Sequence, residues 1–111
     1  MCGDTAVRIR RSRTHLEHGS TEGVAAADPT VPTILLIGDI SFYHDLNGLL
    51  AVGQQKLDNV TIVLLHNDGG SIFRRLPIAG QEPSFTRLFL TPHGLDFAPV
   101  IRMYGLDYTQ A

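Results

Sequence analysis

Oxygen-bearing side chains follow two apolar segments of this chain, at the point where each segment ends. Asp39 comes after the segment Thr33–Ile37, and Asn67 comes after the segment Val60–Leu65. Mg²⁺ usually binds through one or two protein carboxylates or amides together with substrate phosphates. Asp39 could supply a carboxylate, Asn67 an amide oxygen and Gly69 a backbone carbonyl. The three positions predict a site for a divalent cation that carries a diphosphate.

Residues beside these ligands offer groups suited to an anion. Ser41, at the entrance to a predicted helix, could donate its hydroxyl and its backbone N–H to a phosphate. Gly69 and Gly70 allow a positive φ and a close approach of the backbone to a ligand. On residue types alone an ordinary alternative stays open, in which Asp39 only caps the helix and residues 67–70 form a polar turn.

These groups meet only if the two apolar segments are neighbouring parallel strands. Thr33–Ile37 is a continuous apolar run between Pro32 and Gly38, which is typical of a strand covered on both faces. The stretch 44–57 carries leucines at helical spacing, namely Leu46, Leu49, Leu50 and Leu57. A strand, a crossover helix and a second strand form a βαβ unit with parallel strands. The predicted fold class is therefore α/β with a parallel β-α-β core, and such sheets bind ligands at the carboxyl ends of their strands.

The rest of the chain carries weaker signals. Residues 1–22 are polar, with arginines at irregular spacing, and we expect them to be disordered. Residues 84–90 could form one short helix capped by Ser84. Residues 96–104 have apolar side chains three and four apart, so we expect a helix that Gly105 stops, with no strand after it.

The composition bears on the class of partner and on location. Nine Lys and Arg against eleven Asp and Glu give a net charge of −2, so neither nucleic acid nor a membrane is expected as a partner. The single cysteine, Cys2, excludes an internal disulfide and fits a reducing compartment, so we expect a cytoplasmic location. No apolar run has the length of a membrane span.

Three blocks of sequence, in order and at suitable spacing, resemble the C-terminal domain of the MenD family of thiamine diphosphate enzymes. The blocks are Gly38–Leu49 (GDISFYHDLNGL), Asn67–Phe73 (NDGGSIF) and Phe89–Phe97 (FLTPHGLDF). Members of this family are 2-succinyl-5-enolpyruvyl-6-hydroxy-3-cyclohexene-1-carboxylate synthases of menaquinone biosynthesis. The resemblance implies that residues 23–111 are part of a thiamine-diphosphate-binding domain, preceded by a disordered or non-homologous tail at 1–22.

The resemblance also implies a reaction and its cofactors. It implies a transferase that uses thiamine diphosphate and Mg²⁺ (or Mn²⁺) to decarboxylate 2-oxoglutarate and to add the resulting carbanion to isochorismate. Carried over by position, Asp39, Asn67 and the Gly69 carbonyl would hold the metal.

The same resemblance places other residues at the cofactor. Ser41 would lie near the diphosphate. Ile72 and Phe73 would pack against the cofactor or the bound intermediate, and plain core packing of these two residues is the alternative.

The chain departs from the family pattern at its histidines. The turn in these enzymes usually begins with two asparagines, whereas His66 takes the first place here. We interpret Asn67 as the ligand and His66 as a structural neighbour, because Mg²⁺ prefers oxygen. His44 and His93 could act as an acid or a base, and a structural hydrogen-bonding role is the favoured alternative for each.

A second departure concerns a whole domain. In the family the cofactor lies between this domain and a pyrimidine-binding domain with an activating glutamate, and none of Glu17, Glu22 and Glu82 lies in such a motif. We therefore expect a fragment with no assigned catalytic residue, which forms a homo-oligomer or associates with a complementary pyrimidine-binding domain. A non-catalytic binding or association module is the alternative function.

Overall fold

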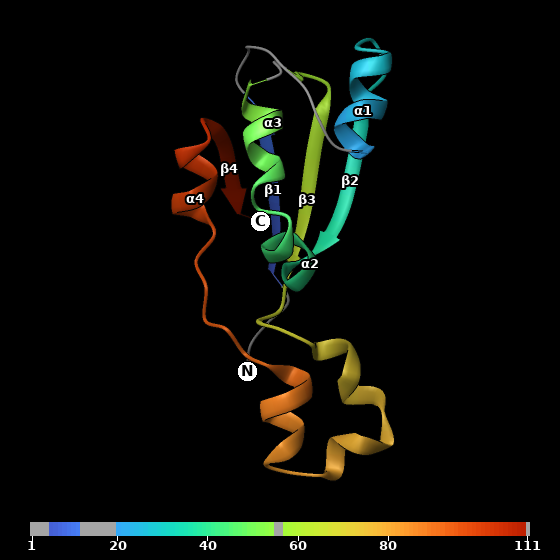
Figure 1. The fold of residues 1–111 in the computed structure, drawn as a ribbon, viewed down its shortest axis with the longest axis vertical. Helices are drawn as coiled ribbons and strands as arrows, with labels where there is room; N and C mark the ends of the chain where they lie inside the picture. The colour runs from blue at the N-terminus through green and yellow to red at the C-terminus, as the bar shows by residue number, and fades with distance from the viewer. Residues whose placement is uncertain (1–4, 12–19, 55–56, 111) are drawn as a thin grey trace.

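The computed structural model describes residues 5–11, 20–54 and 57–110, and its centre is a four-stranded sheet (Figure 1). The strands are β1 (Thr5–Arg11), β2 (Thr33–Gly38), β3 (Val60–His66) and β4 (Leu106–Gln110), in the spatial order β2-β3-β1-β4. β2 and β3 are parallel, whereas β1 is antiparallel to both β3 and β4. The predicted α/β fold class with a parallel β-α-β core is confirmed.

The register of β2 and β3 brings the ends of the two strands together. Thr33 pairs with Val60 and Gly38 pairs with Leu65, so both strands end at the same edge of the sheet. The residues that follow, Asp39 after β2 and the turn after His66, therefore start from neighbouring positions. This edge is the one at which the sequence predicts a ligand.

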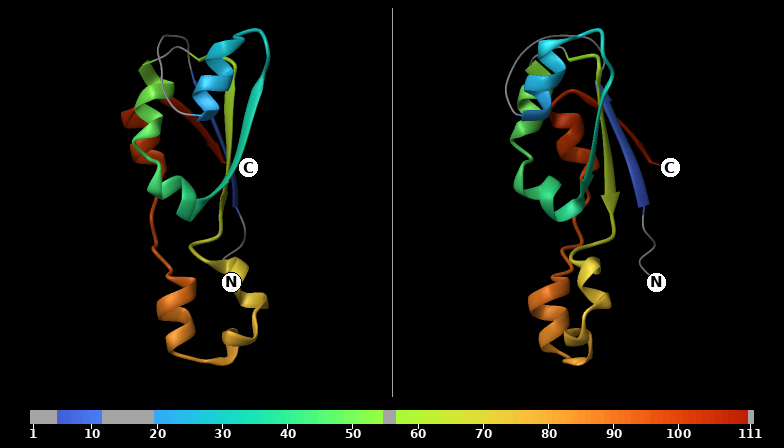
Figure 2. Two further views of the ribbon diagram at one scale, coloured as in Figure 1. Left: turned by 45° about the vertical axis from the view of Figure 1, so that its right-hand side comes forward. Right: turned by 90° about the vertical axis from the view of Figure 1, so that its right-hand side faces the viewer.

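Four short helices cover one face of the sheet (Figure 2). They are α1 (Ser20–Ala27), α2 (Asp39–His44), α3 (Gly48–Gln54) and α4 (Ala98–Met103). Their apolar residues pack on the inward side chains of the strands, and the buried cluster consists of Ala25, Phe42, Leu49, Val52, Leu57, Val60, Ile62, Leu64, Phe97, Ile101 and Leu106. The core thus lies between one helical layer and one face of the sheet.

The crossover helix predicted within 44–57 is present as α3, but it is shorter than predicted, because the chain forms a turn between α2 and α3. Asp45, Asn47 and Gly48 are turn-forming residues, and the Gly48 N–H donates to the Asp45 carbonyl at 2.9 Å. After this break the helix presents Val52 to the core, while Leu50 is 47% exposed. The spacing of the leucines alone did not reveal the turn that separates α2 from α3.

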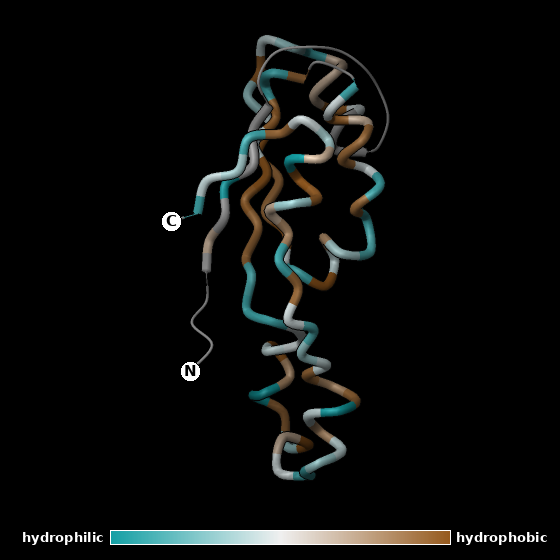
Figure 3. Tube along the Cα trace, turned by 90° about the vertical axis from the view of Figure 1, so that its left-hand side faces the viewer, coloured by the Kyte–Doolittle hydropathy of each residue, from teal (hydrophilic) through white to brown (hydrophobic). Residues whose placement is uncertain are grey.

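The expectation that the first apolar strand is covered on both faces is also wrong within the described residues. β2 alternates between half-buried and exposed positions, with Ile34 70% and Leu36 63% exposed. These side chains point away from the helices, toward the open face of the sheet. Figure 3 shows the apolar stretches of β2 and β3 in brown, beside the paler, more polar strands that carry the two ends of the chain.

Two strands were not predicted. Residues 5–11 form β1 between β3 and β4, so the expected disorder is wrong for these residues, and residues 1–4 and 12–19 lie outside the described residues. The helix expected over 96–104 is present as α4. It ends before Gly105, whose φ is 71°, and the chain then continues as β4, so the expectation of no further strand is wrong.

An arm extends from the ligand edge of the sheet, at the bottom of Figure 1. It consists of three short helical turns, Ser71–Arg75, Pro77–Gly80 and Thr86–Leu90. The last turn confirms a helix near 84–90. The N–H of its first residue, Thr86, donates to Glu82 Oε2 at 3.2 Å and not to the predicted cap Ser84. Among the helices that the structure describes, none has the length and apolar character needed to cross a membrane.

Candidate diphosphate and metal site

Asp39 is the first residue of α2 and directly follows β2, so both elements fix its position. It is buried, with 3% of its surface exposed. Gly38 occupies the capping position before the helix, and Asp39 Oδ1 accepts a hydrogen bond from the backbone N–H of Ile40 at 2.9 Å. Asp39 is therefore not the N-terminal cap of this helix.

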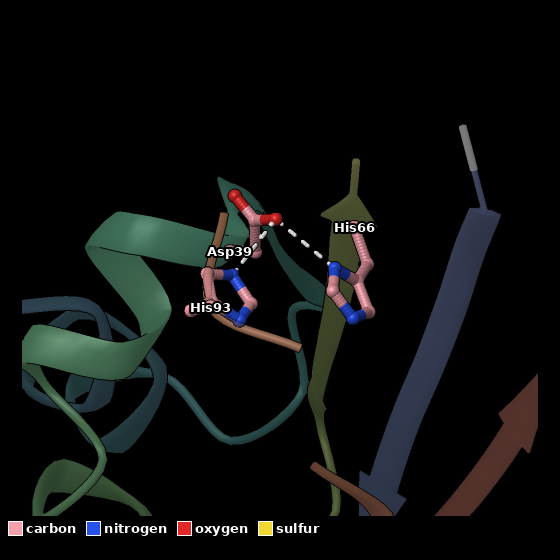
Figure 4. A group of neighbouring side chains, drawn as sticks. All are labelled: Asp39, His66 and His93. Carbon is pink, nitrogen blue, oxygen red and sulfur yellow. Dashed lines mark hydrogen bonds and ion pairs between the residues drawn. The ribbon is translucent and has the colours of Figure 1, made fainter. Parts of the chain in front are cut away.

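The second carboxylate oxygen of Asp39 joins three segments of the chain. Oδ2 accepts hydrogen bonds from the backbone N–H groups of Asn67 at 3.1 Å and Gly69 at 3.0 Å. Two rings reach the same oxygen, with His66 Nδ1 at 3.0 Å and His93 Nε2 at 3.3 Å (Figure 4). The end of β2, the turn after β3 and the loop before α4 thus meet at one carboxylate.

The charge of Asp39 depends on two opposing effects. Burial alone would raise the pKa of the carboxyl, because a poorly solvated position disfavours the charged form. Hydrogen bonds to the carboxylate outweigh burial and hold the pKa of Asp39 below its ordinary value of 3.8. In order of decreasing effect on the pKa, these bonds involve Gly69 N–H, the His66 ring, Ile40 N–H and Asn67 N–H. Asp39 therefore presents a negative charge at neutral pH.

The turn after β3 needs its glycines. Gly69 has a φ of 120°, and a Cβ atom there would lie 2.1 Å from the carbonyl oxygen of Leu90. Gly70 has a φ of −78°, so only Gly69 uses the positive φ that the sequence allowed. Gly70 instead allows the backbone of the turn to approach Leu90 closely, and its N–H donates to the Leu90 carbonyl at 2.7 Å. The turn is thereby held against the last helical turn of the arm.

A partly open cavity of about 370 Å³ lies beside this turn. Every residue predicted for the metal and the cofactor contributes to its wall, and the lining residues are Gly38, Asp39, Ile40, Ser41, Asn67, Gly69, Gly70, Ile72 and Phe73. Ser41 is exposed at the first turn of α2. Ile72 is 78% exposed, so it is not a core residue of the described chain, and Phe73 is 38% exposed. The structure brings all six predicted site residues to one cavity.

A comparison with protein families identifies the family of the chain. Residues 16–111 match the family described as thiamine pyrophosphate enzyme, C-terminal TPP binding domain. The chain belongs to this family. The resemblance noted in the sequence is thus confirmed, and the cavity lies in a thiamine pyrophosphate (TPP) binding domain.

Three relatives of this TPP-binding domain are named 2-succinyl-5-enolpyruvyl-6-hydroxy-3-cyclohexene-1-carboxylate synthase. The protein of Roseiflexus sp. (strain RS-1) is 59% identical over 88 residues, which are 79% of this chain and 15% of that protein. The protein of Halobacterium salinarum (strain ATCC 29341 / DSM 671 / R1) is 52% identical over 88 residues, 79% of this chain and 14% of its own. The protein of Lactococcus lactis subsp. lactis (strain IL1403) is 49% identical over 107 residues, 95% of this chain and 19% of its own.

These alignments define how much of each relative the chain represents. The chain spans between 14% and 19% of the length of these three synthases. Since the alignment with the Lactococcus protein covers 95% of the chain, it includes residues of the predicted tail at 1–22.

The cavity fits a cation that is held by oxygen atoms. Asn67 Oδ1 is buried and has no hydrogen-bond partner among the described residues. A buried amide oxygen without a partner is rare in a folded protein, and a bound ion or water is one explanation for it. Mg²⁺ and Mn²⁺ take carboxylate, amide and carbonyl oxygens, which are the groups that Asp39, Asn67 and Gly69 offer.

Sequence reasoning assigned no role to Asp68, although it organises one wall of the site. Asp68 has a φ of 61°, and its Oδ1 accepts hydrogen bonds from the backbone N–H groups of His93 at 3.1 Å and Gly94 at 2.7 Å. This carboxylate therefore fixes the loop that brings His93 to Asp39. The signal in the sequence was the pair of motifs NDGG and TPHG, whose contact could not be deduced from their order.

The histidines differ in their surroundings. His66 and His93 both contact Asp39, which agrees with the structural role favoured for them. His44 is exposed at the end of α2, with its ring against that of Tyr43 at a centroid distance of 5.8 Å. The described residues show no hydrogen bond between His44 and the group around Asp39, so the structure does not bring it into this site.

Proposed function

We propose that this chain supplies the diphosphate- and metal-binding half of a synthase active site. The enzyme type is 2-succinyl-5-enolpyruvyl-6-hydroxy-3-cyclohexene-1-carboxylate synthase, a transferase of menaquinone biosynthesis that depends on thiamine diphosphate and Mg²⁺ or Mn²⁺. The observation that carries the proposal is the meeting of Asp39, Asn67 and Gly69 at one cavity, with Asn67 Oδ1 buried and without a hydrogen-bond partner in the described part of the chain. The names of the relatives support the enzyme type.

Each of the six site residues has its own role in this proposal. Asp39, Asn67 and the Gly69 carbonyl hold the cation, and Ser41 donates its hydroxyl to the diphosphate. Ile72 and Phe73 form the apolar side of the cavity, against which the cofactor or the bound intermediate packs. When bound, the cofactor would supply the electron sink for the decarboxylation of 2-oxoglutarate and for the transfer of the remaining unit to isochorismate.

In this proposal the complete reaction takes place in an active site to which more than this domain contributes. The chain covers less than a fifth of the three synthases with which it was compared, and no acid or base for the aminopyrimidine ring is assigned in it. We infer that a complementary pyrimidine-binding domain completes the site, through homo-oligomerisation or association. The cytoplasm remains the expected location, on the basis of the single cysteine.

Binding of the cofactor to the chain tests the half-site. Thiamine diphosphate with Mg²⁺ is titrated calorimetrically into the wild type, Asp39→Ala and Asp58→Ala. Asp58 is an exposed carboxylate before β3, at the opposite end of that strand from the site. We expect measurable binding by the wild type and by Asp58→Ala, and at least a tenfold loss in Asp39→Ala. Equal affinities for all three chains would contradict the metal assignment.

A second candidate function is a non-catalytic module that associates with a complete synthase. A mixture of the chain with a complete synthase distinguishes the two. The module predicts a stable mixed complex whose activity is independent of Asp39 in this chain, whereas the half-site predicts that Asp39→Ala lowers the activity that the chain contributes.

A further inference from the structure

His93 is held on two sides by the backbone and by an aromatic ring. The Leu95 N–H donates to His93 Nδ1 at 3.0 Å. The His93 ring packs edge-on against the buried ring of Phe97, with a centroid distance of 5.8 Å and an interplanar angle of 63°. The side chain is 14% exposed. Its orientation is therefore fixed before any ligand arrives.

The hydrogen bond to Nδ1 determines where the ring proton lies. Because Leu95 N–H donates to Nδ1, that nitrogen is an acceptor, and in the neutral ring the proton is on Nε2. Nε2 lies 3.3 Å from Asp39 Oδ2, so it donates to this oxygen. The neutral form of His93 is sufficient for the contact.

His66 completes the enclosure of the same oxygen. Its ring stacks on that of His93 with an interplanar angle of 11° and a centroid distance of 5.4 Å, and its Nε2 contacts the Leu95 carbonyl at 3.1 Å. The backbone of Leu95 thus anchors both rings. Together with the N–H groups of Asn67 and Gly69, the rings surround Asp39 Oδ2.

These contacts argue against a metal held by the histidines themselves. The ligand atoms of Asp39, His66 and His93 lie within 4.8 Å of one another, which would suit a transition metal. A metal at His93 Nε2 would however require the ring proton on Nδ1, where Leu95 N–H already donates. Oδ2 is also occupied by two backbone donors, Asn67 N–H and Gly69 N–H. His93 and the two backbone N–H groups give hydrogen bonds to Asp39 Oδ2 and do not replace the carboxylate as a metal ligand.

We propose that His93 is a positioning residue for Asp39, which holds Oδ2 away from the cavity and leaves Oδ1 for the cation. Figure 4 shows one carboxylate oxygen facing both rings and the other pointing away from them. The described residues give Oδ1 a single donor, the N–H of Ile40, so it keeps capacity for a cation. This inference rests on the proposed metal site and adds which oxygen serves it and what fixes that choice.

Variants of His93 test the inference in the full chain. His93→Ala removes the donor, whereas His93→Gln places an amide N–H near the former Nε2, and His44→Ala is the exposed control. Mn²⁺ is titrated in the presence of thiamine diphosphate, and free Mn²⁺ is measured by electron paramagnetic resonance. Loss of a residue that orients a metal ligand typically costs 10- to 100-fold in metal affinity. We expect such a loss in His93→Ala, substantial recovery in His93→Gln and no change in His44→Ala.

A metal-free measurement separates this inference from the proposed function. The amide proton shifts of Asn67 and Gly69 report their hydrogen bonds to Asp39 Oδ2, and we expect them to move upfield in His93→Ala and to return in His93→Gln. If the wild type fails to bind Mn²⁺ with thiamine diphosphate, the proposed half-site is wrong, and the amide shifts still decide the inference. Unchanged amide shifts in His93→Ala, or equal Mn²⁺ affinity of His93→Ala and the wild type, would overturn it.

Discussion

Asp39 combines burial with a set of donors that only a charged carboxylate can fully use. With 3% of its surface exposed, the residue would cost stability if its hydrogen bonds were removed. Its backbone donors come from the turn after β3, so the charge also holds that turn in place. The same carboxylate therefore serves the fold and the proposed cation site.

The lowered pKa of Asp39 predicts how stability depends on pH. In the unfolded chain the carboxyl has its ordinary pKa of 3.8, and in the folded chain the pKa is lower. Stabilisation by this group is therefore present above pH 3.8 and is lost as the pH falls through the folded pKa. Urea unfolding from pH 7 to pH 2 should show a smaller acid-induced loss in Asp39→Asn than in the wild type. Parallel pH profiles for the two proteins would contradict this prediction.

Gly69 provides a second prediction at the level of one residue. Gly69→Ala adds a Cβ atom 2.1 Å from the Leu90 carbonyl oxygen at a φ of 120°. Gly94→Ala is the matched control, because its φ is 60° and nothing lies within 4 Å of the added atom. We expect the control to lose about 1–2 kcal/mol, the cost of a left-handed residue with a side chain. Gly69→Ala should lose clearly more in denaturant unfolding, and equal losses would show that the turn can move away from Leu90.

At the level of elements, β3 is the strand on which the site and the core both depend. Leu64 is fully buried, whereas its neighbour Leu65 is 42% exposed on the other face of the sheet. Leu64→Ala should cost about 2–5 kcal/mol, since truncation of a buried leucine loses burial and leaves a cavity. Leu65→Ala should cost clearly less, and chemical denaturation measures both values. Similar losses would mean that the open face of β3 is covered in solution.

The elements that the sequence predicted are those with a continuous local pattern. The apolar runs of β2 and β3 and the spacing of Val100 and Ile101 in α4 are readable because their periodicity is local. The break at Asp45–Asn47 was missed because Leu46, inside the break, keeps helical spacing with Leu49 and Leu50 of α3. β1 was missed because its pairing with β3 and β4 is a tertiary contact, and TAVRIRR carries charges that favour a tail interpretation.

The residues of the site were predicted from motifs, but the contacts between these residues were not. The sequence identified Asp39, Asn67 and Gly69, and the structure brings them to one cavity. It could not show that His93 contacts Asp39, because 54 residues separate them and the contact depends on a loop fixed by Asp68. Local patterns indicate which residues carry the chemistry, whereas their mutual orientation depends on how distant loops fold.

At the level of the whole molecule, the sheet has a covered face and an open face. The helices lie on one side of the sheet (Figure 2). Leu35 and Ile62 belong to the core on that side, while Ile34 and Leu36 remain 70% and 63% exposed. Across the register Ile34 pairs with Thr61 and Leu36 pairs with Val63 of β3, so Leu36 lies beside another apolar side chain on this face. β2 is also an edge of the described sheet. An apolar face beside an unpaired edge favours association.

The open face predicts that the purified chain self-associates and that a charge on β2 weakens this association. Sedimentation velocity should show species larger than the 12.1 kDa monomer, with a concentration-dependent distribution. Ile34→Lys introduces a charge that is costly to bury, so the monomer fraction should rise. Val24→Lys is the matched control, because Val24 is 66% exposed on α1, away from the open face. If both variants sediment like the wild type, the chain associates through another surface or remains a monomer. If both variants raise the monomer fraction equally, the added charge is responsible and not the open face of β2.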